Sequence, residues 1–88
     1  MAVPSTPPPA DVLELCAYLV RELVDEPEAV SVTEEVGSGG ERVFRVVVAD
    51  ADRGKVIGRS GRVVRALRTV IRAGGVRRQE RIHIEIDE

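Results

Sequence analysis

The chain has 88 residues, a length that allows one compact domain and excludes two. With 43% apolar residues, 32% charged residues and only Tyr18 and Phe44 as aromatics, it is predicted to be globular with an aliphatic core, which excludes an intrinsically disordered chain and an aromatic platform for stacking bases. The net charge of −2 conceals a segregation, because residues 1–52 carry eleven acidic and three basic residues, whereas residues 53–81 carry ten basic residues and one acidic residue.

The N-terminal part predicts a tail followed by one amphipathic helix. Residues 1–10 contain four prolines and no apolar periodicity, so they are expected to form a flexible tail ahead of a single domain at residues 11–88. Asp11 is a candidate N-cap with Glu14 as its capping-box partner, and the helix must end before Pro27. Apolar residues recur at helical spacing on one face: Val12, Leu15, Cys16, Leu19, Val20 and Leu23.

Two β-rich segments then predict an antiparallel hairpin. Residues 30–36 and 42–49 alternate partly between apolar and polar side chains, and four residues between them, 37–40, have the composition of a turn. A third strand is predicted at residues 81–87, with Ile82 and its alternate neighbours facing the core and His83 facing outward.

Two helices are predicted between the second and third strands. Asp50 and Asp52 are candidate caps for a short helix over residues 53–57, and a longer helix is expected from Arg62 to about Ala73, ended by Gly74–Gly75. A helical crossover favours parallel pairing of the strands that it joins. The sequence therefore predicts an α+β fold of order α-β-β-α-α-β, with a three-stranded mixed sheet covered by helices on one face.

The segment between these two helices is the candidate site. Gly58-Arg59-Ser60-Gly61 forms a loop in which the glycines leave room for a phosphate backbone, next to the positive end of the following helix. On that helix, four arginines occupy the arc opposite the apolar residues: Arg62, Arg65, Arg68 and Arg72. A charge run alone is commonly a solvated helix face, and a Gly-x-x-Gly alone commonly marks only a turn. Their combination predicts an anion-binding surface.

The nine residues from Gly54 to Arg62, Gly-Lys-Val-Ile-Gly-Arg-Ser-Gly-Arg, closely resemble the signature of KH domains, and the chain from Asp11 to Asp87 resembles the small bacterial single-KH proteins of the KhpA family. This resemblance implies a KH domain of type II order that binds single-stranded RNA. In KH domains the loop clamps the backbone of about four nucleotides while the bases lie in an aliphatic groove. Such a groove needs no aromatic platform.

The resemblance also implies roles for individual residues. Gly58 and Gly61 would shape the loop, and Arg59 and Ser60 would meet phosphates. The remaining candidates are flanking or groove residues: Lys55 and Arg62 beside the phosphates, Arg65 in the arginine arc, and Val56, Ile57 and Val64 as groove residues that are alternatively core residues.

Other chemistry has little support in the sequence. Cys16 lies in the apolar face of the first helix, where a buried inert thiol is expected, and the only histidine, His83, is either a partner contact or a solvated strand residue. One cysteine and one histidine do not make a usual zinc site, and no nucleophile with its base is evident, so we expect no enzyme, cofactor, metal or small-molecule substrate. Without a signal peptide, a disulfide pair or an apolar run of about 20 residues, the protein is expected in the cytoplasm and off the membrane.

Two functional hypotheses follow. The first is an RNA chaperone or post-transcriptional regulator, which the family resemblance links to cell elongation and division and to pairing with itself or with a larger KH-containing protein. The second is a protein interaction module whose KH fold serves mainly to dimerise or to assemble with such a partner.

Overall fold

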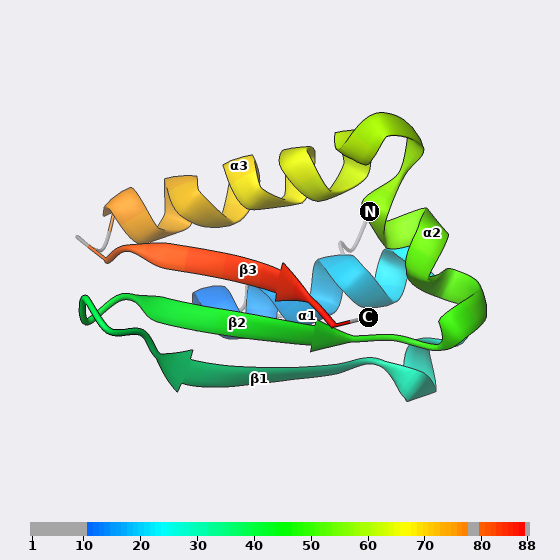
Figure 1. Cartoon of the computed structure of the whole chain (residues 1–88), viewed down its shortest axis with the longest axis horizontal. Helices are drawn as coiled ribbons and strands as arrows, with labels where there is room; N and C mark the ends of the chain where they lie inside the picture. The colour runs from blue at the N-terminus through cyan, green and yellow to red at the C-terminus, as the bar shows by residue number, and fades with distance from the viewer. Residues whose placement is uncertain (1–10, 78–79, 88) are drawn as a thin grey trace, which may run out of the picture.

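The structure, a computed structural model, describes residues 11–77 and 80–87 (Figure 1). The main elements are α1 (Val12–Leu23), β1 (Ser31–Val36), β2 (Arg42–Val47), α2 (Arg53–Ile57), α3 (Arg62–Arg77) and β3 (Ile82–Ile86). Short 3₁₀ helices lie at Pro27–Ala29, Asp50–Asp52 and Arg59–Gly61. The predicted α-β-β-α-α-β order is confirmed, and the tail predicted at residues 1–10 lies outside the described residues.

The sheet has the predicted mixed topology. Its strand order is β1-β2-β3, with β1 antiparallel to β2 and β2 parallel to β3. Val46 of β2 is paired with Val32 of β1 and with Ile86 of β3, so apolar residues of neighbouring strands that contact the core are in register. The helices lie on one side of this sheet, with α1 behind it and α3 running along the β3 edge (Figure 1).

The core lies between the sheet and the helices, and it consists of aliphatic side chains packed around the ring of Phe44. Phe44 and Val46 have no exposed surface, and the helices contribute other fully buried side chains from α1, α2 and α3: Cys16, Val20, Val56 and Ile71. Burial raises the pKa of the Cys16 thiol to about 11, because the thiolate would lose its hydration there. The thiol is therefore inert, as its position in the apolar face predicted.

The end of α3 differs from the prediction. Gly74–Gly75 was expected to stop the helix, but α3 continues through both glycines to Arg77. A Cβ on Gly75 would lie 2.8 Å from Cδ1 of Ile82 and 2.9 Å from the carbonyl oxygen of Glu80. Gly75 therefore allows the returning chain to approach the helix closely, which is a packing role that the local sequence does not distinguish from a helix stop.

Asp52 also differs from the prediction, because its carboxylate does not cap α2. Its oxygens accept hydrogen bonds from the backbone N–H groups of Asp25 and Glu26, at 3.2 and 3.0 Å. The side chain is buried, and it joins the segment after α1 to the start of α2. A buried carboxylate needs such partners, since leaving it without hydrogen bonds would be costly.

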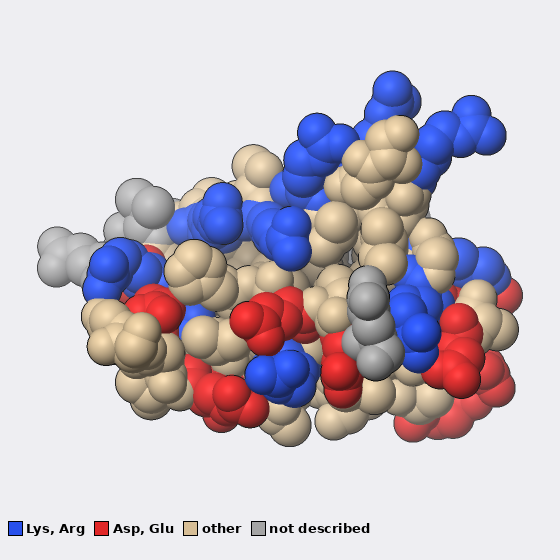
Figure 2. Space-filling model, viewed as in Figure 1, with Lys and Arg blue, Asp and Glu red and all other residues tan. Residues whose placement is uncertain are grey.

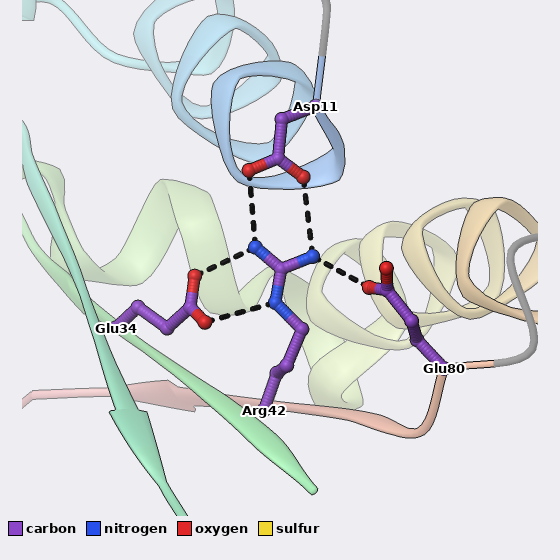
Figure 3. A network of polar contacts seen from close by, with 4 residues as sticks. All are labelled: Asp11, Glu34, Arg42 and Glu80. Carbon is purple, nitrogen blue, oxygen red and sulfur yellow. Dashed lines mark hydrogen bonds and ion pairs between the residues drawn. The ribbon is translucent and has the colours of Figure 1, made fainter.

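At the opposite end of the sheet, Arg42 joins three elements of the fold (Figure 3). Its guanidinium donates to both oxygens of Asp11 at the start of α1, at 3.1 and 3.0 Å, to Glu34 of β1 at 2.9 and 2.6 Å, and to Glu80 before β3 at 2.6 Å. The guanidinium also lies 4.9 Å from the centroid of the Phe44 ring.

Within residues 11–77 and 80–87, no helix combines the length and apolar character needed to cross a bilayer.

Candidate nucleic-acid interface

The loop between α2 and α3 is a tight turn built on unusual backbone angles. Gly58 ends α2 with φ 76°, Ser60 has φ 57° and ψ 26°, and Gly61 has φ 73°. The Gly58 N–H donates to the carbonyl of Gly54 at 2.8 Å, and the Gly61 N–H donates to the carbonyl of Gly58 at 3.1 Å. In the described part of the chain, Ser60 is the one non-glycine residue with positive φ, a conformation that is sparsely populated and concentrated at functional sites.

Gly58 is required by space as well as by its φ angle. A Cβ there would lie 2.5 Å from Cγ2 of Val63 and 2.9 Å from the Val63 backbone nitrogen. At Gly61 a Cβ would meet only atoms 3.9 Å away or farther, so that position is constrained by its φ angle alone. The turn therefore packs its first glycine against the first turn of α3 and leaves the rest of the loop open.

Arg65 holds the loop from the side of α3. Its Nη2 donates to the carbonyl oxygen of Ser60, and its Nε lies 3.4 Å from the carbonyl oxygen of Gly61. These carbonyls lie just before α3 and point toward its C-terminus, so a guanidinium four to five residues later can reach both. Arg65, predicted as a direct RNA contact, thus also positions the turn.

Lys55 lies on α2, and its ammonium is already paired with carboxylates. It forms an ion pair with Asp25 and lies 3.7 Å from a carboxylate oxygen of Asp52. The hydrogen bond to Asp25 is the main reason that the pKa of Lys55 is raised. Lys55 therefore stands beside the loop, as predicted, but Asp25 competes with any phosphate for its charge.

The other predicted site residues divide by exposure. Arg59, Ser60 and Arg62 have exposed side chains at the tip of the loop and the start of α3. Val56 is fully buried and Val64 is 7% exposed, whereas Ile57 is half-buried. The alternative that these residues are core residues is therefore correct for the buried Val56 and Val64, whereas Ile57 keeps some exposed apolar surface.

The charge segregation seen in the sequence is also a segregation in space. Figure 2 shows Lys and Arg gathered over α3 and around the turn between α2 and α3, while most Asp and Glu side chains lie lower, toward β1 and β2. A half-buried arginine on α3, Arg68, donates to the Ile84 carbonyl at 3.2 Å and so continues this basic surface to the edge of β3. The field around the loop favours an anion even though the whole chain is acidic.

Sequence reasoning missed the contacts that hold the site together. The pairing of Lys55 with Asp25 joins residues 30 positions apart, and no local pattern indicates it. The spacing of Arg65 from the loop was a sequence signal for its contact with the loop carbonyls, because a donor four residues after a turn lies on the same side of the helix as the turn.

Comparison with known proteins agrees with this geometry. The family model described as KhpA/KhpB, KH domain, matches residues 14–86. A curated relative named RNA-binding protein KhpA, from Treponema pallidum, is 48% identical over 73 residues, which cover 83% of this chain and 90% of the relative. Relatives with the same name from Clostridium acetobutylicum and Listeria monocytogenes are 40% and 37% identical and are covered over 96% and 97% of their length.

A solved structure shares the fold at low sequence identity. The crystal structure of Era from Aquifex aeolicus superposes with a TM-score of 0.53 and 18% identity, over 98% of this chain and 35% of that protein. The likeness concerns the fold of one part of a longer protein. The family match spans both helices around the loop and all three strands, and the chain therefore belongs to the KhpA/KhpB family of KH domains.

Proposed function

We propose that this protein clamps the backbone of short single-stranded RNA segments with the turn Gly58–Gly61, and that it acts as an RNA chaperone or post-transcriptional regulator in the cytoplasm. The observation that carries the proposal is the turn itself, with exposed Arg59 and Ser60 at its tip and two glycines in backbone conformations that admit a close approach. The name of the relatives, RNA-binding protein KhpA, supports the same ligand.

The arrangement suits phosphates more than base edges. Backbone amides at the start of α3 and the guanidiniums around the turn offer positive charge and donors, which fix a strand without reading its sequence. Half-buried Ile57 offers apolar surface for a base. We therefore infer weak sequence preference, as expected of a chaperone or a broad regulator, and a link to cell elongation and division remains the proposal that the family resemblance suggests.

The direct test is the double substitution Arg59→Asp with Ser60→Asp. Aspartate tolerates the left-handed backbone of position 60, so the fold should survive while phosphate is repelled. The matched control is Arg21→Asp with Ser38→Asp, which makes the same charge change at exposed positions on α1 and on the hairpin turn. Loss of binding to a single-stranded RNA oligomer by the loop variant alone is expected. Equal affinities for both variants would overturn the proposal.

Salt provides a second measurement of the same site. If about three phosphates are neutralised, the logarithm of the binding constant should fall with the logarithm of salt concentration with a slope of about −2 on single strands. A slope near zero would contradict phosphate clamping.

A second function, assembly with another KH domain, is favoured by one specific observation. An apolar groove of about 240 Å³ lies between α1 and α3, where Leu23 is 39% exposed and Val70 is 48% exposed. Glu22 borders the groove on α1, and arginines cover the neighbouring face of α3. A second copy packed by a two-fold axis would meet opposite charges around the shared apolar contact.

This alternative is tested by Val70→Asp and by measuring mass in solution. If the groove is a dimer contact, the wild type is a dimer and the variant a monomer at the same concentration. Unchanged mass would refute this contact. Val47→Asp is the matched control, because Val47 is 38% exposed on the outer face of the sheet, away from the groove.

A further inference from the structure

A second recess lies along α3, away from the turn. It has a volume of about 270 Å³ and is lined by Arg72 of α3 and by the start of the third strand, where Glu80, Arg81, Ile82 and His83 follow one another. β3 is the outer strand of the sheet, so one of its edges is free. Ile82 points into the core and His83 points away from it, and the recess that both residues line lies across this free edge.

This recess has the chemistry of a nucleobase site. Arg72, Arg81 and His83 are exposed, and a guanidinium plane and an imidazole ring are groups on which unstacked RNA bases stack. The Arg81 guanidinium donates to the Gly39 carbonyl at 2.5 Å, so Arg72 and His83 are the stacking groups. Among the described lining residues Glu80 is the one carboxylate, and it accepts a hydrogen bond from Arg42 at 2.6 Å, a cation that it shares with Asp11 and Glu34. His83 supplies an exposed ring at the recess, whereas Phe44 is buried and the exposed Tyr18 lies on α1.

Arginines connect the recess to the turn. Arg65, Arg68 and Arg72 are three and four residues apart, so they follow one side of α3. Arg65 contacts the turn, and Arg68 reaches the Ile84 carbonyl on β3. From Arg62 to Arg72 the helix rises about 15 Å, so a strand held at the turn would pass over basic side chains before it reaches the recess.

We propose that the recess formed by Arg72, Arg81, Ile82 and His83 is an accessory subsite that stacks a nucleobase of the same RNA strand, beyond the nucleotides held at the turn. The subsite rests on the proposed function, because the turn must first hold the strand. It makes the affinity depend on RNA length: a strand of about four nucleotides fills the turn and its groove alone, whereas a longer strand also reaches the recess.

The experiment compares four- and eight-nucleotide oligoadenylates by fluorescence anisotropy on three proteins. These are the wild type, Arg72→Ala with His83→Ala, and the control Arg21→Ala, which removes one positive charge on α1 outside this path. A longer oligomer has more binding registers on every protein, so the informative quantity is the gain in affinity with length. The recess variant should lose about tenfold of that gain, whereas the control should keep it. The two variants, which each remove one arginine, should bind the tetranucleotide with similar affinity.

Two chimeric strands test whether a base is needed. Each chimera has four adenylates and four abasic nucleotides, and the abasic nucleotides stand at one end of the first chimera and at the opposite end of the second. Neither chimera should show the gain in affinity with length. A gain that survives in the recess variant, or in a chimera, would overturn the subsite while leaving the turn as the RNA site. Tetranucleotide binding that persists in the Arg59→Asp and Ser60→Asp variant would instead overturn the proposed function, and absence of all binding to the wild type would overturn both.

Discussion

The ammonium of Lys55 is held by the carboxylate of Asp25, which joins the helix before the turn to the segment after α1. Both side chains are largely exposed, at 46% and 76%, so water and salt screen the pair and it adds little to the stability of the fold. Its larger consequence concerns the proposed RNA site, where Asp25 would compete with RNA phosphates for a cation beside the loop.

Replacing Asp25 by Asn should therefore tighten RNA binding. The backbone N–H of residue 25 still donates to Asp52, so the local structure is retained while Lys55 loses its ion pair with residue 25 and keeps only Asp52 at 3.7 Å. We expect affinity to rise a few-fold and the salt slope to steepen by about 0.7, the contribution of one added phosphate contact on single strands. Titrations at several salt concentrations measure both quantities. Glu28→Gln removes an exposed charge from the same segment, and an equal gain in that control would show a general charge effect.

Substitution of Gly58 by Ala should damage the turn. The new Cβ would meet Val63 at 2.5 Å in a residue with φ 76°, so unfolding free energy should fall by about 1–3 kcal/mol and RNA affinity should fall with it. Gly54 is the matched control, since a Cβ there meets nothing within 4 Å and Ala favours the helix. Urea denaturation of the two variants gives the comparison. Equal stabilities would contradict the steric requirement at Gly58.

Acid should weaken the contact between Asp11 and Arg42. The hydrogen bond from Arg42 lowers the pKa of Asp11 below its ordinary value of 3.8, so its stabilisation is complete above that pH and is lost as the pH falls through the folded-state pKa. Asp11→Asn should cost about 1 kcal/mol at pH 7, and its difference from the wild type should vanish in stronger acid. Urea denaturation across pH tests this, with Glu28→Gln as the reference. A difference that is independent of pH would contradict the assignment.

The two glycines inside α3 should respond oppositely to alanine. Gly75→Ala forces a Cβ to 2.8 Å from Ile82 and 2.9 Å from a backbone carbonyl, and we expect a loss of about 1–3 kcal/mol. Gly74→Ala places its Cβ 3.4 Å from Val12, an ordinary contact, so the gain in helix propensity of up to about 1 kcal/mol should be retained. Thermal unfolding of both variants measures the sign. Similar melting temperatures would refute the close packing at Gly75.

The periodicity of apolar residues was sufficient to predict the helices and strands and their order. The alternation of isoleucines from Ile82 predicted a strand with one buried face, and the spacing from Val12 predicted the inward face of α1, because local geometry alone decides which side chains share a face. The prediction that α3 ends at Gly74–Gly75 was wrong. A glycine has the same local signature in the sequence whether it stops a helix or, like Gly75, lets a neighbouring strand pack closely. The candidate loop was evident because its glycines, charges and flanking helices are contiguous in the sequence.

The sequence by itself therefore determined the class of fold, the family resemblance and the position of the candidate turn. Only the tertiary structure decided which cations of the basic segment are engaged by distant partners: Lys55 with Asp25, and Arg68 with β3. It also brought Arg72 beside His83 to form a recess. The physical reason is that charge and hydrogen-bond partners are selected by distance in space, and residues 11 to 30 positions apart come together only when the sheet and helices pack.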